Sequence, residues 1–514
     1  SFTNQNLFGD TGNRGYNSTS SIEYKVTPRD VVANSLMLNR RRGTDGQLSE
    51  YTELDATQTP TDEYLMLRDN LTRGWLFDNT VSWKRTLEPR KHELATELRF
   101  NRSVDDDGTN LARQELAPPA STGAQSALER DDVNAVSKQL NAQLDYTRTM
   151  TARTKLETGY KGTERWLDRD YRVMKDALGD GNWVASSLSN AFNFDETVHA
   201  GYAVLSETIG KFDLQQGLRG ELAERNFTLG SQNYPKKYNS LFPSAVFMYK
   251  PTDAIQAKLS YSRRIRRPGT QELNPFPVFF DQQNVFIGNP NLNPEYTDAF
   301  ELGLSKTGQL GSIQLSPFYR RTTNVIRVNI NTDAVIDGRS VTSVSFENLA
   351  TGTSWGSDLN GNLKLGPKFN GFAAFNVFKM VTDGGSQSAL SSNAVTWSTR
   401  FNATTQFTPT VSLQAFYFYR APVNIEKGRF EAQQMFQMSM RKKLYGDKAS
   451  FSVRVADPFN TLKFRVKAGD DNITQLTERR FGVRATYFTF QYNFGQAPKI
   501  RLPKEEAPPP PVFN

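Results

Sequence analysis

The segment from residue 267 to residue 295 carries the side chains best suited to contact a ligand. Its middle combines aromatic rings, amides and one carboxylate: Phe276, Phe279, Phe280, Asp281, Gln282, Gln283, Asn284 and Phe286. Rings stack on flat solutes, while amides donate and accept hydrogen bonds. We therefore predict that this segment contacts a flat or amphipathic small molecule. The alternative is that its rings pack against one another inside a long loop.

Cations in the segment 458–481 form the second candidate site. Lys463, Arg465 and Lys467 follow one another closely there. Cations beside an aromatic surface suit an anionic, partly apolar chelate, because stacking and charge offset its loss of hydration. Ligand contact by Lys463 and Arg465 is the resulting prediction.

Catalytic and metal chemistry find little support in this chain. It has no cysteine and only two histidines, His92 and His199. Thiolate metal sites and thiol nucleophiles are therefore excluded, and no spacing favours a histidine–serine pair. The run Asp105–Asp107 could hold Ca²⁺, but without further oxygen ligands it fits a solvated loop tip better. Phosphate-binding glycine loops and a basic helix are missing, so we expect no enzyme, no metal, no cofactor and no nucleic-acid partner.

Strands with two unlike faces must position these residues. At the end of the chain every second residue belongs to one largely aromatic series: Arg484, Thr486, Phe488, Phe490, Tyr492 and Phe494. The residues between them are polar or amphipathic. A period of two is typical of a strand, and it recurs along nearly the whole chain.

The connections between the expected strands alternate between short and long. Short turns are predicted at 27–30, 87–90, 149–151, 209–211, 250–253, 307–311, 366–368, 407–410 and 445–448. Long polar connections are predicted at 43–70, 104–133, 163–193, 227–237, 267–295, 330–350, 381–393 and 458–481. Short connections at one end of the strands and long connections at the other are typical of a transmembrane antiparallel β-barrel with short periplasmic turns and long extracellular loops. Segments 267–295 and 458–481 should then lie over the mouth of the lumen.

Composition agrees with a barrel. The chain has 514 residues, a hydrophobic fraction of 37% and an aromatic fraction of 12%. Half of every barrel strand is polar, so a low average hydropathy is expected, and lipid-facing walls are rich in aromatic residues. A soluble propeller is disfavoured because no internal repeat of about 40–50 residues is found.

The face opposite the apolar residues is charged. Its predicted members, all pointing into the lumen, are Arg219, Glu221, Lys258, Arg264, Arg320, Arg420 and Arg454. Arg219 and Glu221 are expected to pair with each other, with neighbours or with a plug. The remaining cations could attract an anionic ligand, anchor a plug, or bind lipopolysaccharide phosphates at the rim.

Four separated motifs carry a family resemblance. They are Leu156–Tyr160, Gly217–Glu221, Leu241–Ala245, and the central series Tyr261–Pro268, Leu273–Phe276, Gly288–Tyr296 and Phe300–Gly303. In order and spacing they resemble TonB-dependent outer-membrane receptors, in particular the outer-membrane β-barrel family. The turn-forming residues 288–295 are expected to be structural, and Pro243 is expected at the outer end of a strand.

The resemblance implies a 22-stranded barrel closed by an N-terminal plug that TonB pulls. About 19 strands are counted here, with neither plug nor TonB-binding box, so the first strands and the plug are expected to precede Ser1. The expected organisation is a polar loop at 1–19, a barrel at 20–494 and a Pro-rich periplasmic tail at 495–514, which is either idle or a docking segment for a periplasmic partner.

Two functions remain open at this point. One is an energy-coupled receptor in the outer membrane of a Gram-negative bacterium that imports a scarce solute, with membrane lipid, lipopolysaccharide, TonB and a small molecule as partners. The alternative is a passive or structural barrel in an envelope assembly.

Overall fold

The computed structural model describes residues 2–494 with several gaps. The residues left out are 1, 56, 118–126, 280–283, 337–338, 385–390, 426–427, 447, 470–473, 481–483 and 495–514. Phe280, Asp281 and the Pro-rich tail therefore lie outside the described residues. In the described part of the chain, no helix is long and apolar enough to cross a membrane.

The fold is all-β. In the described residues a large sheet, antiparallel apart from one short parallel pairing, has 22 strands, and three of them are very short: β7 (Val184–Ala185), β12 (Val278–Phe279) and β13 (Asn284–Ile287). The other 19 agree with the number counted from the alternation of side chains. The described residues contain one helix, α1 (Thr270–Leu273).

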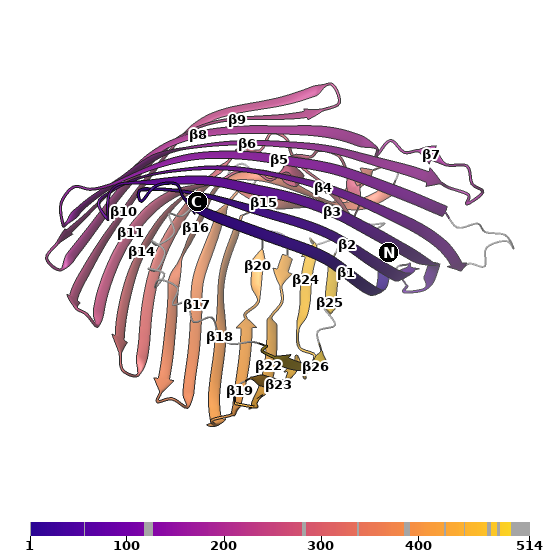
Figure 1. Cartoon of the computed structure of the whole chain (residues 1–514). Helices are drawn as coiled ribbons and strands as arrows, with labels where there is room; N and C mark the ends of the chain where they lie inside the picture. The colour runs from indigo at the N-terminus through magenta and orange to yellow at the C-terminus, as the bar shows by residue number, and fades with distance from the viewer. Residues whose placement is uncertain are drawn as a thin grey trace. The chain divides into compact units, whose positions relative to one another are not determined.

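The first of two compact units comprises Ser1–Gly303, Pro317–Trp355 and Met380–Ser392. Its long strands are β1 (Phe2–Lys25), β2 (Asp30–Leu54), β3 (Pro60–Glu88), β4 (His92–Ala117), β5 (Ala127–Thr149), β6 (Thr154–Asp176), β8 (Asn190–Ile209), β9 (Phe212–Leu229), β10 (Gln232–Thr252) and β11 (Ile255–Arg266). Each pairs antiparallel with the next long strand along the chain. Figure 1 shows β1 to β6, β8 and β9 side by side.

The second unit comprises Leu304–Ser316, Gly356–Lys379 and Asn393–Asn514. The strands divided between the units are β14 (Glu295–Gly308), β15 (Gly311–Ile336), β16 (Arg339–Leu365) and β17 (Phe369–Asp383). Those of the second unit are β18 (Ser392–Thr408), β19 (Val411–Arg420), β22 (Gln433–Leu444), β23 (Ala449–Ala456) and β26 (Ala485–Tyr492). The expected pairing of the last strand with 448–456 is confirmed by the β23–β26 ladder.

All nine predicted short turns are confirmed, because each lies between the end of one long strand and the start of the next. Local chemistry closes them. In the first turn the Thr27 hydroxyl donates to the Asp30 carboxylate at 2.6 Å and accepts from the Asp30 backbone N–H at 3.0 Å. In the turn between β8 and β9, Gly210 has φ +62°, a value that costs glycine little.

The ladders separate an apolar face from a polar face, as the alternation predicts. On β9, Leu218 and Leu222 are 50% and 59% exposed on one face, while Arg219 and Glu221 lie on the other. In the second unit, Met438 on β22 pairs with Ala415 on β19 and Val455 on β23. We call these two sides of each unit the apolar face and the polar face.

The predicted polar loop at 1–19 is wrong, because β1 begins at Phe2 and pairs with β2 along its whole length. Many of the predicted long loops are likewise strand: β3 has 29 residues and β4 has 26. A strand needs only about 9–11 residues to span a bilayer. The parts of these strands that extend beyond the hydrocarbon do not contact lipid and need no apolar face. Their sequences are therefore polar and resemble those of loops.

Pro243 is not at a strand end but in the middle of β10. The register of β10 with β11 begins at the next residue, Ser244, which pairs with Ser262. Proline has no N–H to donate, and at Pro243 the neighbouring ladder on that side has not yet begun. The missing donor therefore costs little.

Replacing Met438 by Arg should destabilise the folded barrel by about 2–4 kcal/mol, because a charge near the bilayer midplane is poorly solvated. Arg at the adjacent Gln437, on the polar face, should cost much less. Both variants can be compared by urea-induced unfolding in vesicles, followed by heat-modifiable gel mobility. Equal destabilisation by the two substitutions would contradict the assignment of faces.

Candidate functional site

The 267–295 segment folds back onto the polar face of β8 and β9 in the first unit. Leu273 on α1 and Leu292 are fully buried, with 0% and 1% exposure. They form one apolar cluster with four further side chains: Phe192, Phe194, Phe227 and Ile326. A fully buried side chain of this size contributes about 1.5–3 kcal/mol, so this part of the segment is firmly attached.

Gly288 lets two parts of the segment approach closely. Its N–H donates to the Asn274 carbonyl at 2.7 Å. A Cβ at Gly288 would lie 2.6 Å from both the nitrogen and the oxygen of the Asn274 backbone. Any larger residue would push the backbone at position 288 away from the backbone of Asn274. This close approach explains the glycine in the Gly288–Tyr296 motif.

Arg267 connects the segment to β9 and β10 through hydrogen bonds and ion pairs. Its guanidinium donates to the Glu221 carboxylate at 2.5 Å and to the Tyr238 hydroxyl at 2.8 Å. It also lies 3.8 Å from the carboxylate of Glu196, which pairs with Arg165 at 3.2 Å. Burial alone would lower the pKa of Arg267, but Tyr238 and the two carboxylates raise it above its ordinary value. The cation is therefore held charged between two buried anions.

The same network continues across the wall. Arg219 donates to Glu221 at 2.7 Å, which confirms the expected pairing of these two residues. Arg219 also lies over the ring of Tyr202, whose hydroxyl donates to Asp145. Tyr202 can lie flat here because its neighbour is Gly159, where a Cβ would be 2.6 Å from the Tyr202 hydroxyl.

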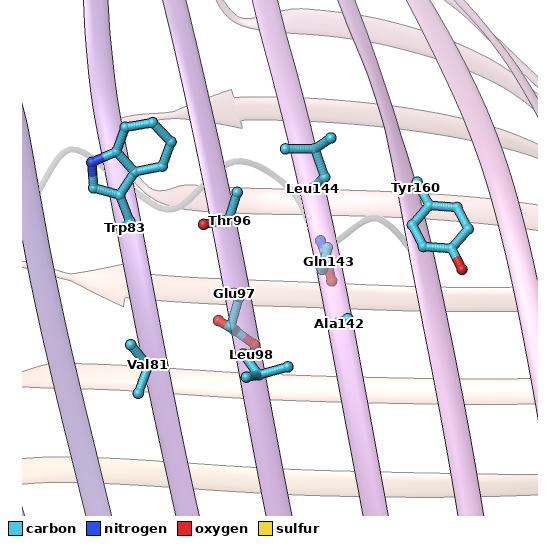
Figure 2. A pocket seen from close by; sticks show the side chains of 9 residues that line it. All are labelled: Val81, Trp83, Thr96, Glu97, Leu98, Ala142, Gln143, Leu144 and Tyr160. Atoms are coloured by element: carbon cyan, nitrogen blue, oxygen red, sulfur yellow. The ribbon is translucent and has the colours of Figure 1, made fainter.

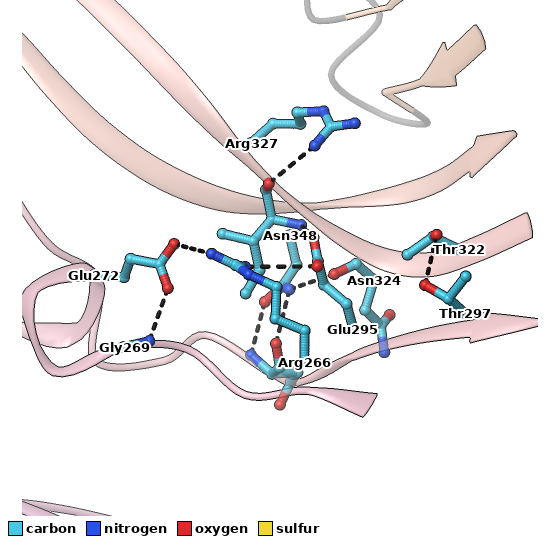
Figure 3. Close-up of polar contacts among 11 residues, drawn as sticks. Arg266, Gly269, Glu272, Glu295, Thr297, Thr322, Asn324, Arg327 and Asn348 are labelled. Carbon is cyan, nitrogen blue, oxygen red and sulfur yellow. Dashed lines mark hydrogen bonds and ion pairs between the residues drawn. The ribbon is translucent and has the colours of Figure 1, made fainter. Parts of the chain in front are cut away.

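A second polar cluster fastens both ends of the segment. Arg266 lies between Glu272, at 2.5 Å, and Glu295, at 3.5 Å (Figure 3). The other Glu272 oxygen accepts the Gly269 N–H at 2.7 Å, and Glu295 accepts the Ile326 N–H at 2.5 Å. These charge-assisted bonds are stronger than neutral ones.

Asparagines connect the segment to β15 and β16. The Asn348 side chain accepts the Asn293 N–H at 2.8 Å and donates to the carbonyls of Asn293 and Asn324 (Figure 3). Asn289 donates to the Phe346 carbonyl at 3.2 Å. In addition, β13 pairs in parallel with β16. The structural role expected for residues 288–295 is thus confirmed.

The ligand contacts predicted in this segment stay predictions. Phe276 and Phe279 are partly exposed, and Asn284 is partly exposed at the start of β13. The buried members of the segment are others, notably Leu273, Val285 and Leu292. Its internal packing, considered as the alternative above, accounts for those buried positions, while the rings of Phe276 and Phe279 keep part of their surface exposed.

The charged residues predicted to face the lumen lie on the polar face, where Arg219 is paired with Glu221. Arg320 packs over the Phe318 ring at 4.3 Å, Arg454 over Tyr487 at 4.2 Å and Arg420 over Phe430 at 5.9 Å. Lys258 pairs with Met248 in the β10–β11 ladder, next to the outward Leu259. Arg264 lies six residues further on the same face of β11.

A separate four-stranded sheet carries the cations predicted at 458–481. It consists of β20 (Val423–Ile425), β21 (Gly428–Phe430), β24 (Lys463–Gly469) and β25 (Thr474–Arg480). It lies in connections opposite the short turns of the second unit. Alternation and register place five cations on one side, which we call the basic face: Arg429, Lys463, Arg465, Lys467 and Arg480. On the other side Phe430 and Phe464 are in ring contact at 5.8 Å.

Glu478 is the acid at the centre of the basic face. It lies 2.8 Å from Arg480, 3.3 Å from Arg465 and 3.9 Å from Lys463. The hydrogen bond from Arg480 and the nearby cations lower the pKa of Glu478. The acid is therefore ionised at neutral pH and neutralises part of this face.

The weaker sequence candidates are separated by the fold. His199 is hydrogen-bonded to Tyr160 at 2.6 Å, and His92 packs edge-on against Tyr146. Asp105–Asp107 is not a loop tip but part of β4, where successive residues point to opposite faces. Among the described residues, no group of three or more potential metal ligands is found.

Sequence analysis missed the central members of the buried network, Arg267, Glu196 and Arg165. Arg267 was part of a recognised motif but was not assigned a partner. The signal lay in strand register, because Arg165 and Glu196 are direct partners in the β6–β8 ladder. Aligning that hairpin would have placed the two charges side by side.

Replacing Arg267 by Met should leave Glu221 and Glu196 buried without their shared partner, at a cost of about 3–5 kcal/mol. We expect faster amide hydrogen exchange at Gly288, Asn289 and Leu292, whose N–H groups are bonded within the segment. Arg172→Met is the control, because the Arg172–Asp170 pair is exposed and worth about 0–1 kcal/mol. Unchanged exchange in the Arg267 variant would show that apolar packing alone holds the segment.

Comparison with known proteins agrees with this architecture. Residues 85–492 match the outer membrane protein beta-barrel family. Comparison with curated proteins finds no match. Similar solved structures include the ferric-catecholate import receptor Fiu from E. coli K12, with TM-score 0.58, 10% identity, and coverage of 95% of this chain and 80% of that one.

Two further structures share the fold. The siderophore receptor PiuA from Acinetobacter baumannii has TM-score 0.56 and 13% identity, covering 92% of this chain and 80% of that one. The pyoverdine receptor FpvA from Pseudomonas aeruginosa has TM-score 0.56 and 12% identity, with coverages of 95% and 78%. Since the family match covers most of the sequence, the chain belongs to the outer membrane protein beta-barrel family and crosses the outer membrane of a Gram-negative bacterium.

Proposed function

We propose that this chain is the barrel of a TonB-dependent receptor that imports a scarce, anionic solute, such as a siderophore-like chelate or another nutrient. The observation that carries the proposal is the basic face, where five cations lie beside two acids, Glu478 and Glu431, on a sheet outside the bilayer. Arg429, Arg465 and Arg480 keep 44–57% of their side chains exposed. Exposed cations that are only partly neutralised attract anions from solution.

The chemistry of a metal chelate suits the basic face of this small sheet. Its carboxylate or catecholate oxygens would accept hydrogen bonds from the guanidinium groups, which match planar anions well. The first unit offers Phe276 and Phe279 as separate surfaces for stacking, with Asp281, Phe280 and Asn284 nearby in sequence. Structures with the same fold are described as a ferric-catecholate import receptor and a siderophore receptor, which supports this class of solute.

We infer energy coupling from the resemblance of the central motifs to TonB-dependent receptors. In such a receptor a plug would lie against the polar face of the barrel, which carries Arg264 and Arg320. A passive barrel would instead let solutes pass down their gradient without such coupling.

Neutralising the basic face should weaken capture of an anionic chelate. Lys463→Gln, Arg465→Gln and Lys467→Gln together should lower the affinity of cells for a ferric chelate by about tenfold or more. Glu478→Gln should raise that affinity, because it removes the negative charge that neutralises part of the basic face. The matched control removes three charges near the short turns, Lys364→Gln, Lys368→Gln and Lys442→Gln. Chelate binding to intact cells, measured at two salt concentrations, tests this. Equal loss in both triple variants would remove the basic face from the site.

Dissipating the proton gradient with a protonophore should stop accumulation of the labelled chelate while leaving its binding at the cell surface intact. Accumulation is measured as cell-associated label after washing, with and without the protonophore. Uptake that continues unchanged would favour the passive barrel. Substitution of Phe276 and Phe279 by Ala in the same assay tests the first unit separately.

A further inference from the structure

A hollow on the apolar face of the first unit is floored by two glycines. Gly201 on β8 pairs with Gly220 on β9, and this pair is flanked by Tyr160 on β6 and Leu241 on β10. A Cβ added to either glycine would meet nothing within 4 Å. The hollow has a volume of about 590 Å³ and is also bordered by Leu222.

A second hollow lies on the other side of Tyr160. Figure 2 shows its side chains on neighbouring strands, with Trp83 at one end and Tyr160 at the other. It measures about 310 Å³, and Leu98 and Leu144 also line it. Tyr160 is therefore a ridge between two depressions of one apolar wall.

The glycine-floored hollow is lined mainly by apolar surface, to which His199, Glu221, Asn239 and Ser240 add polar groups. Leu222, Leu241 and Tyr160 are 59%, 57% and 43% exposed. Lipid chains are the molecules that meet this face, since a barrel presents its apolar face to the hydrocarbon.

The height of the hollow favours the outer leaflet. Gly201 lies eight residues before Ile209, the last residue of β8 at the short-turn end. At about 3.3 Å per residue and a strand tilt of about 45°, it lies roughly 19 Å above the turn. The apolar band of such barrels is about 25 Å tall, so Gly201 belongs to its upper half.

Two polar side chains that are hydrogen-bonded to each other, those of Tyr160 and His199, border the hollow. Nδ1 of His199 and the Tyr160 hydroxyl are 2.6 Å apart, and Asn239 is part of the same lining. Tyrosine and histidine have an apolar body and a polar tip, an arrangement suited to the boundary between acyl chains and headgroups.

We propose that this hollow binds an acyl chain of lipopolysaccharide, the lipid of the outer leaflet, with Gly201 and Gly220 as its floor and the Tyr160–His199 pair at its polar edge. Glycine at both positions keeps the space open that a side chain would fill. This site depends on the membrane orientation of the barrel and not on the solute that the receptor imports.

The test uses the intact protein purified from outer membranes and stripped of lipid in detergent. Native mass spectrometry measures rebinding of lipid A. Gly201→Leu with Gly220→Leu should lower its apparent affinity about tenfold or more, because the added side chains occupy the hollow. Ala203→Leu is the control, since Ala203 lies on the same face of β8, pairs with Leu218 and does not line the hollow. Equal rebinding by the filled variant and the control would overturn the proposal.

Crosslinking to the unsubstituted protein gives an independent answer if the filled variant does not fold. Lipid A and phosphatidylethanolamine, each with a photoreactive group in an acyl chain, are reconstituted separately with the protein. Lipid A should label residues 199–201 and 220–222 preferentially. Labelling spread evenly over the apolar face, or labelling of these positions by phosphatidylethanolamine alone, would refute a lipopolysaccharide site.

Discussion

The pairing of backbone amides is the constraint on which the rest of this structure depends. Within hydrocarbon an unpaired N–H or C=O costs several kcal/mol, so each strand must form a ladder with its neighbours. The continuous register from Phe2–Leu54 to Lys25–Val31 is one result. Exceptions occur where the neighbouring ladder has not begun, and Pro243 lies at such a place.

Once the ladders are formed, alternation sends neighbouring side chains into opposite environments. On β9 this exposes Leu218 to lipid and places Arg219 and Glu221 on the polar face. Charges gathered on that face need partners, because a buried carboxylate without one is strongly destabilising. The 267–295 segment provides Arg267, and the wall in turn provides the apolar cluster that holds the segment. Each is therefore stabilised by the other.

Periodicity and turn chemistry predicted the strands, the nine short turns and the Arg219–Glu221 pair, because these depend on residues close in sequence or on a simple alternation. The conformation of the 267–295 segment could not be predicted in this way. It has no period of two, and its partners, such as Glu221 and Asn348, come from distant strands. The polar start at 1–19 was misjudged because a strand outside the bilayer has no apolar face to reveal it.

The length of the strands has a consequence for whatever approaches the cell from outside. With 25 residues in β2 and 29 in β3, much of the outer rim is hydrogen-bonded sheet where shorter strands would leave free loops. A molecule that docks on a free loop must first restrict its motion, at about 1–2 kcal/mol for each ordered residue. Here that entropy was lost when the barrel folded. A molecule can therefore bind this rim selectively, through its shape, and still bind quickly. The reason is that the sheet does not need to change conformation before binding.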